Sequence, residues 1–342
     1  SLDLADGRTA ISFGLGDPDI DVSALGVSGS GAPPSFTFTG IANSPFIAAP
    51  DGIDSVRPTL TTAGAGNTID LPTTGTGTLT AGVGRVILAN TGTGNGIAVN
   101  ATAGSIFAII GNDITTAGGQ ALNVSTTGGT ADMLRAVVNN NRFERSTAGS
   151  TVSFNGQNIP VGQNSIAIRS FASNTITGNG TGGGLLFNNV RFDSDGAGGA
   201  VNATALTVGA PGTRVEGDGV TFLNPTGIFN AGTLDIANNG GTGLVVDTKG
   251  AGTTFTLNST GGSVDTTDGT AMNLDPLTVG MTLGSVDVFG GSSAGIIFDV
   301  VAGSFTVTGA TTITGTDGYG ISSLAGNTGT FNFNTLAIDN TG

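Results

Sequence analysis

The sequence predicts an all-β fold, a right-handed parallel β-helix (solenoid) of about ten or eleven coils with three short strands per coil. Gly accounts for 61 of 342 residues, and short alternating runs of Val, Ile, Thr and Phe lie between Gly and Asn clusters. Such runs are typical of strands bounded by turns. An aliphatic residue follows a small residue at regular intervals: Leu244, Ala271, Ile296 and Ile321 are 27, 25 and 25 residues apart. That period is the length of one solenoid coil.

The composition argues against other classes of protein. Glu occurs only at Glu144 and Glu216, and Lys only at Lys249, so the residues that favour exposed helix faces are scarce. The apolar fraction of 37% indicates a folded chain rather than a disordered one. The net charge of −14 disfavours binding to nucleic acid and to anionic membranes. No apolar run approaches the ~18 residues of a membrane-spanning helix.

Coils are expected to begin where a small residue precedes an aliphatic one after a polar turn. Eleven positions fit this pattern: Gly52-Ile53, Gly96-Ile97, Ala121-Leu122, Ser165-Ile166, Gly184-Leu185, Ala200-Val201, Gly227-Ile228, Gly243-Leu244, Ala271-Met272, Gly295-Ile296 and Gly320-Ile321.

The later coils indicate where the strands lie and which side chains point inward. In the coil that begins at Gly295, strands are expected at residues 296–298, 304–307 and 311–313. Alternation places Phe305 and Val307 in the core. Phe255, Phe305 and Phe331 fall near the same place in their coils, so we expect stacked phenylalanines to fill a narrow core.

The regular pattern covers only part of the chain. Residues 66–342 are expected to form the β-helix, and the pattern is interrupted in mid-coil at Gly342, which predicts that the chain continues. In residues 1–65, Pro33, Pro34, Pro45, Pro50 and Pro58 interrupt strand pairing, so this region is interpreted as irregular coils, a cap or a docking segment. Residues 132–158, with three arginines and Glu144, are expected to form an excursion from the coil.

An Asn-x-apolar motif recurs at intervals and predicts a structural ladder. Its members are Asn112, Asn141, Asn174 and Asn188, with Asp218 in the equivalent place. Asn tolerates the left-handed turn conformation and bonds to neighbouring backbone. Side chains stacked at one turn can therefore bond to one another along the axis.

Three segments carry a resemblance to a known group of proteins. They are residues 174–180 (Asn-Thr-Ile-Thr-Gly-Asn-Gly), 238–244 (Asn-Asn-Gly-Gly-Thr-Gly-Leu) and 316–321 (Thr-Asp-Gly-Tyr-Gly-Ile). The pattern resembles the right-handed parallel β-helices of bacterial cell-surface proteins, such as autotransporter passengers and large adhesins. This resemblance implies an architecture and an extracellular or cell-surface location, but the same coil serves many functions.

The candidate for chemistry is a group of charged residues in the middle coils. The chain has no histidine, so it can form neither a Ser-His-Asp triad nor a histidine zinc site. Two carboxylates about 5–10 Å apart can hydrolyse a glycoside, and Asp193 and Asp195 would share one strand face. With Arg169 and Arg191 they form a candidate glycan groove, although Arg-Asp pairing on an acidic rod is the simpler interpretation. We assign no catalytic residue.

One segment near the N-terminus is a candidate metal site. Asp17, Asp19 and Asp21 alternate in sequence, as do the first ligands of many Ca²⁺ loops. The Gly and Glu that complete an EF-hand loop are absent, so an acidic, solvated loop is the alternative. No cofactor other than Ca²⁺ is predicted.

Taken together, these features predict an extracellular structural protein rather than an enzyme: a rigid stalk, adhesin or filament subunit at a bacterial surface. Unpaired strand edges at its two ends would allow end-to-end stacking of copies, and a host surface or glycan would be its other partner. The alternative is a polysaccharide-active enzyme or glycan-binding module of the tailspike or lyase type. Converging Asp and Arg side chains in a groove would favour the alternative.

Overall fold

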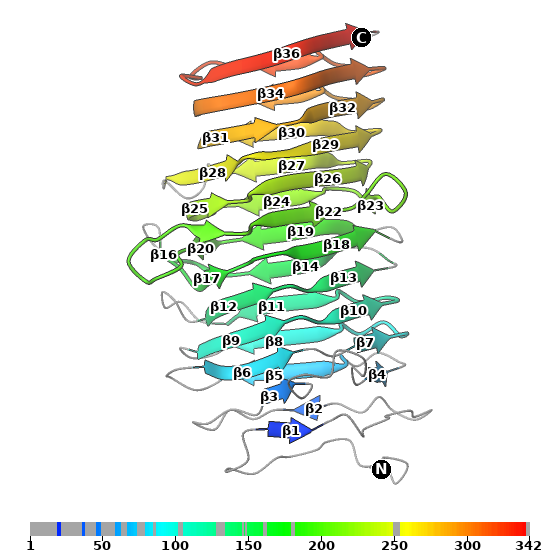
Figure 1. Cartoon of the computed structure of the whole chain (residues 1–342), viewed down its shortest axis with the longest axis vertical. Coiled ribbons are helices and arrows are strands. Elements are labelled where there is room, and N and C mark those ends of the chain that lie inside the picture. The colour runs from blue at the N-terminus through cyan, green and yellow to red at the C-terminus, as the bar shows by residue number, and fades with distance from the viewer. Residues whose placement is uncertain are drawn as a thin grey trace.

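In the computed structural model, the chain is a parallel β-solenoid whose coils stack along one axis (Figure 1). The structure describes residues 19–21, 36–37, 46–48, 59–62, 67–73, 79–84, 87–101, 105–127, 134–145, 147, 149–159, 163–178, 182–248 and 254–339. All elements in these ranges are strands, and none of the ranges contains a helix that could span a membrane. The predicted all-β solenoid is confirmed.

Two large sheets, in which every pairing is parallel, and one small hairpin make up the fold. Sheet 1 consists of β2 (Phe36–Thr37), β5 (Ile69–Thr73), β8 (Ile97–Ala101), β11 (Leu122–Thr126), β14 (Ser150–Asn155), β19 (Gly183–Asn188), β24 (Val220–Leu223), β27 (Thr242–Asp247), β30 (Thr270–Asp275), β33 (Ile296–Phe298) and β35 (Ile321–Ser323). Sheet 2 consists of β1 (Asp19–Asp21), β3 (Phe46–Ala48), β4 (Thr59–Thr62), β6 (Leu79–Gly84), β7 (Ile87–Asn90), β9 (Ser105–Ile110), β10 (Asp113–Thr116), β12 (Leu134–Asn139), β13 (Arg142–Arg145), β17 (Ile166–Ser170), β18 (Asn174–Gly178), β20 (Val190–Phe192), β21 (Val201–Asn202), β22 (Ala205–Val208), β23 (Val215–Glu216), β25 (Thr226–Asn230), β26 (Thr233–Asn239), β28 (Phe255–Ser259), β29 (Gly261–Thr267), β31 (Leu277–Leu283), β32 (Ser285–Phe289), β34 (Val301–Thr314) and β36 (Thr330–Asp339). The antiparallel hairpin joins β15 (Asn158–Ile159) to β16 (Gln163–Asn164).

A typical coil has the three strands that the sequence predicts. β27 lies in sheet 1, and β28 and β29 follow it in sheet 2. In the last two coils the two strands of sheet 2 run together as β34 and β36. About eight coils are formed, fewer than the ten or eleven predicted. The strands nearest the N-terminus, such as β2 and β3, belong to coils of which only parts are described.

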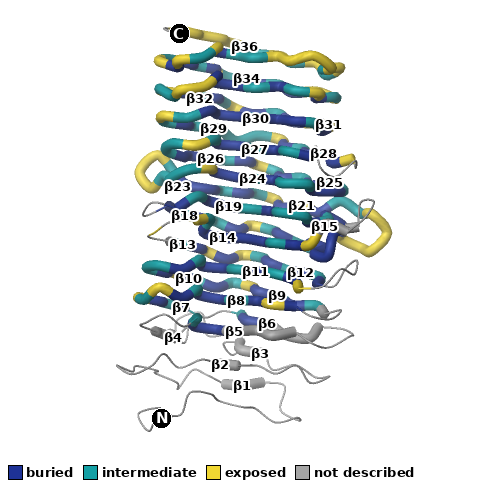
Figure 2. Tube along the Cα trace, turned by 180° about the vertical axis from the view of Figure 1, so that it is seen from behind, coloured by how far each residue is buried: buried dark blue, intermediate teal, exposed yellow. Residues whose placement is uncertain are grey.

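The core is a continuous column of apolar side chains between the sheets. Figure 2 shows the buried residues of successive coils in dark blue. Strand alternation creates the core, as in β34, where Phe305 and Val307 are buried and Ser304 and Thr306 point outward, as predicted. In sheet 1 one buried aliphatic position runs from coil to coil through Ile97, Leu122, Val152, Leu185, Val220, Leu244, Met272 and Ile296.

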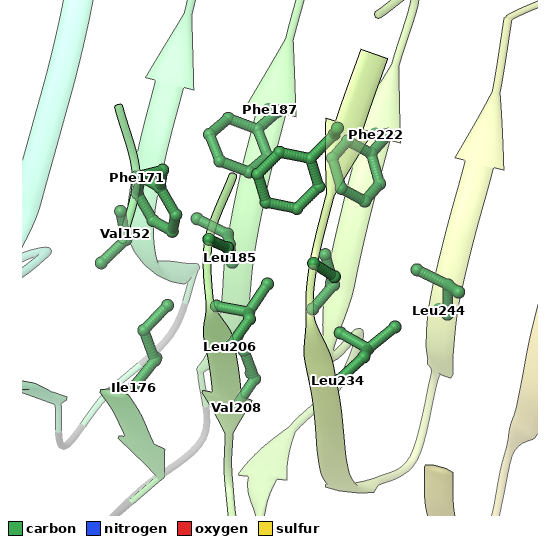
Figure 3. Close-up of a cluster of buried hydrophobic side chains, with 14 of the residues drawn as sticks. Val152, Phe171, Ile176, Leu185, Phe187, Leu206, Val208, Phe222, Leu234 and Leu244 are labelled. Carbon is green, nitrogen blue, oxygen red and sulfur yellow. The ribbon is translucent and has the colours of Figure 1, made fainter. Parts of the chain in front are cut away.

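Stacked phenylalanines fill the middle of this core. Phe154, Phe187 and Phe222 share one register position of sheet 1, and their ring centroids are 5.2 and 5.3 Å apart (Figure 3 shows the last two). Phe305 and Phe331 also share a register position, as predicted. Phe255 does not, because it pairs with Gly227 at another position of sheet 2.

Three of the predicted coil starts belong to the wrong sheet. Ile166, Val201 and Ile228 lie in β17, β21 and β25 of sheet 2, where a small residue also precedes an aliphatic strand. In this region the residues that occupy the buried aliphatic position of sheet 1, and that the prediction missed, are Val152 and Val220. Gly52-Ile53 lies outside the described residues.

The predicted excursion at residues 132–158 is also wrong. Most of that segment forms β12, β13 and β14, which are regular strands of the two sheets. The chain instead leaves the coil at the β15–β16 hairpin, where Asn164 Nδ2 donates a hydrogen bond to the carbonyl of Asn224 at 3.1 Å. The role predicted for residues 1–65 stays a prediction, because most of them lie outside the described ranges.

Candidate functional site

The four residues of the predicted groove come together at the end of β20. Arg169 is in β17, and Arg191 is in β20 of the next coil, opposite Ala167. Asp193 follows β20 directly and is 0% exposed. Its Oδ2 lies 2.7 Å from Arg191 Nη2, and its Oδ1 lies 3.3 Å from Arg169 Nη1. Arg169 Nη1 also donates a hydrogen bond to the Asp193 carbonyl at 2.7 Å.

The two aspartates organise the loop that follows. Asp193 Oδ1 accepts hydrogen bonds from the amides of Gly196 and Gly198 at 2.7 and 3.0 Å. Asp195 Oδ1 accepts them from Ala197 and Gly199 at 2.7 and 2.9 Å. Gly196 and Gly198 have φ angles of 88° and 96°, in the left-handed region that glycine favours. The loop is therefore folded around the two carboxylates.

This geometry makes the cluster a clamp between two coils. The Asp193 carboxylate is buried under two guanidinium groups, so a bound glycan could not reach it. The Asp195 carboxyl is exposed, and hydrogen bonds from the Ala197 and Gly199 amides lower its pKa below the ordinary 3.8. A general acid in a glycosidase requires the opposite shift, a raised pKa.

Acidification is expected to loosen this loop only below the pH at which an ordinary Asp side chain takes up its proton. Because the folded-state pKa of Asp195 is lowered, its hydrogen bonds stabilise the loop above pH 3.8 and are lost as the pH falls through the folded-state pKa. In an NMR titration, the amide shifts of Ala197 and Gly199 should report a midpoint below 3.8. Asp195→Asn should abolish that titration, and a midpoint above the ordinary value would contradict the prediction.

The predicted asparagine ladder exists over three coils. Asn112 Nδ2 donates to Asn141 Oδ1 at 2.9 Å, and Asn141 Nδ2 donates to Asn174 Oδ1 at 3.0 Å. All three side chains are buried, and each also donates to a backbone carbonyl, those of Val83, Ile109 and Val138 respectively. The ladder therefore satisfies polar backbone at a buried corner of the solenoid.

The other two predicted members lie elsewhere. Asn188 is in β19 of sheet 1, and its neighbour Asn189 takes the left-handed conformation with φ 51°. Asp218 is at a different turn, where its Oδ1 accepts a hydrogen bond from the Thr242 amide at 2.7 Å. At the ladder position after Asn174 the chain places Leu206, so an apolar residue ends the ladder.

A second ladder was missed by the sequence interpretation. Asn230 Nδ2 donates to Asn202 Oδ1 at 2.6 Å, and Asn258 Nδ2 donates to Asn230 Oδ1 at 2.8 Å, on the outer side of sheet 2. The signal was the equal spacing of these residues, 28 positions in each step.

Removing one buried ladder member should destabilise the protein far more than removing an outer one. Asn141→Ala leaves the Asn112 amide and the Ile109 carbonyl without their partner, at a cost of about 3 kcal/mol in the free energy of unfolding. Asn202→Ala, at an exposed position, should cost less than about 0.5 kcal/mol. Urea unfolding measures both, and equal midpoints would contradict a structural role for the buried ladder.

The predicted Ca²⁺ site lies largely outside the described residues. Asp17 is not described, and Asp19 and Asp21 are placed only as backbone, in β1, where they pair with Phe46 and Ala48 of β3. Elsewhere, the side chains that the structure describes include no cluster of three metal-binding residues. Ca²⁺ binding by these aspartates stays a prediction.

Comparison of this chain with protein-family models, with curated proteins and with solved structures finds no match. What the structure defines is an architecture, the parallel β-solenoid.

Proposed function

We propose that this chain is a structural protein of the bacterial exterior, a rigid rod that serves as a stalk, adhesin or filament subunit. The observation that carries the proposal is the unbroken stack. Parallel ladders link every described coil to the next, and one apolar core runs beneath them. Bending such a rod would break many hydrogen bonds and core contacts at once, so the rod is stiff.

Further features support this proposal. The asparagine ladders tie successive coils together at the corners, and the charged cluster around Asp193 joins two coils instead of leaving a free groove. The absence of cysteine from the sequence fits a protein that is exported without disulfides. The high Thr, Asn and Ser content of the outer faces fits an exposed surface. We include in this proposal that the chain is of the autotransporter or large-adhesin type.

The last coil supports axial self-assembly. In β36, Leu336 and Ile338 are 45% and 44% exposed, and β36 pairs with β34 along one side only in the described part of the chain. An unpaired strand edge with apolar side chains beside it is a template for another strand. We propose that this edge takes up a further coil, and that in a preparation of this chain alone a second copy supplies it.

Electron microscopy of the purified chain, with and without Ca²⁺, tests both proposals. About eight coils at ~4.8 Å each give a rod near 40 Å. Uniform rods support the structural role, and fibres many times longer support stacking. Leu336→Lys with Ile338→Lys should stop fibre growth, while the control Thr312→Lys, inside the stack, should not. Bent or collapsed particles would contradict the rod, and short rods alone would contradict stacking.

A further inference from the structure

A hollow of about 250 Å³ opens on the side of the C-terminal coils. The turns that lead into three successive strands of sheet 1, namely β27, β30 and β33, form it. Its polar lining comes from Thr242, Asp268, Asn273, Ser292 and Ser293, and Ile297 supplies an apolar surface. Pockets for drug-sized ligands span about 300–1,000 Å³, so this hollow has room for a smaller unit.

Four polar side chains around the hollow are not used by the fold, whereas the hydroxyl of Thr270, which also lines it, donates a hydrogen bond to the Ala294 carbonyl at 2.8 Å. Within the described residues, the side chains of Asp268, Asn273, Ser292 and Ser293 make no hydrogen bond or ion pair. The asparagines of the two ladders, by contrast, are bonded to neighbouring coils. The hollow therefore combines a carboxylate, an amide and two hydroxyl groups that can bond to a ligand.

Backbone geometry keeps the Asp268 carboxylate accessible. Asp268 has a φ angle of 54°, and Gly290 of the next coil has one of 80°. A Cβ atom at Gly290 would come within 2.6 Å of Asp268 Oδ1. A larger residue at Gly290 would thus crowd the carboxylate.

Two exposed aromatic residues lie on turns that adjoin the hollow, outside its lining. Phe289 is 68% exposed and precedes the turn that supplies Ser292 and Ser293. Tyr319, the one tyrosine of the chain, is 74% exposed, and its carbonyl accepts a hydrogen bond from the Gly295 amide of the preceding coil at 2.9 Å.

We propose that this hollow binds one neutral sugar unit of a polysaccharide. Asp268, Asn273 and the two serines would bond to sugar hydroxyl groups, and Ile297 would cover the apolar face of the sugar. The lining has one carboxylate and no basic residue, so it disfavours anionic sugars, phosphates and sulfates. The inference is independent of the rod proposal, because it concerns a side of the solenoid rather than its stiffness.

Affinity electrophoresis of the whole chain through gels that contain laminarin, dextran, yeast mannan or amylose tests this site, with polygalacturonate as the anionic control. We expect at least one neutral polysaccharide to retard the chain. Asp268→Asn, which preserves the turn, combined with Asn273→Ala should weaken that retardation at least tenfold. The matched control, Asp287→Asn with Asn332→Ala, changes the same residue types away from the hollow and should leave retardation unchanged.

Three results would overturn the proposal: no retardation by any of the four neutral polysaccharides, equal retardation of the native chain and the hollow variant, or retardation by polygalacturonate alone. Equal urea midpoints of the two double variants would show that a loss of binding is not a loss of folding. Rods seen by electron microscopy together with no retardation would contradict the sugar site and leave the rod proposal standing.

Discussion

Phe187→Ala is expected to lower the free energy of unfolding by about 3–5 kcal/mol. Phe187 is fully buried, and its ring stacks on Phe154 and Phe222 and meets Phe171 and Phe192 edge-on. Figure 3 shows Phe187 with Phe171 and Phe222. Truncation removes ring contacts with three successive coils and leaves a cavity in the middle of the stack. Neighbouring coils of a solenoid stabilise one another, so the loss should spread beyond one coil. Urea unfolding followed by circular dichroism measures it.

Two variants bracket this expectation. Phe187→Leu keeps most of the buried volume and should cost clearly less, while Phe289→Ala, at an exposed position, should cost less than about 0.5 kcal/mol. If Phe187→Ala and Phe289→Ala unfolded at the same urea concentration, the central stack of rings would not be the main source of core stability.

Asp193→Ala is expected to cost about 3–5 kcal/mol, the range for breaking a buried ion pair from one side. The substitution leaves Arg169 and Arg191 facing each other without the carboxylate between them, and the amides of Gly196 and Gly198 lose their acceptor. Both arginines keep partial access to water, which places the expected cost at the lower end of the range.

Asp193→Asn separates the two contributions of this side chain. Its amide oxygen can still accept the two glycine amides, so a smaller loss than in Asp193→Ala would measure those hydrogen bonds. Asp195→Ala is the matched control, because the same loop carries that carboxyl exposed to water. Equal stability of the native chain and Asp193→Ala would show that the clamp contributes nothing to the stack.

The architecture could be predicted from the sequence because strand alternation and turn residues are local signals. They predicted the inward orientation of Phe305 and Val307 and placed Leu244 and Ile296 on one column. Between these two, the spacing pointed to Ala271, and the structure shows that the column passes through Met272, one residue later. Register in the middle coils could not be predicted. Ala200-Val201 has the same small–aliphatic form as Gly243-Leu244, and only its pairing with β25 shows that it belongs to sheet 2.

The candidate site was predictable in part for the same reason. Arg191 and Asp193 are two residues apart, so their pairing could be foreseen from the sequence. The contact with Arg169 depends on the register of the neighbouring coil, and the burial of Asp193 depends on the loop that folds over it. A local motif also cannot tell which of the adjacent Asn188 and Asn189 adopts the left-handed conformation. The hollow beside Asp268 was missed because its lining comes from three coils.

Each coil adds the same length to the rod, because the register of sheet 1 is constant while the turns between its strands vary in length. Successive members of the buried column are separated by as few as 24 residues, from Val220 to Leu244, and by as many as 35, from Leu185 to Val220. Each step nevertheless advances the rod by one strand spacing of ~4.8 Å. The length of the rod is therefore set by the number of coils and not by the number of residues. Duplication or loss of one repeat in a gene would lengthen or shorten the rod in fixed increments, while sequence added at a turn would decorate its side and leave its length unchanged.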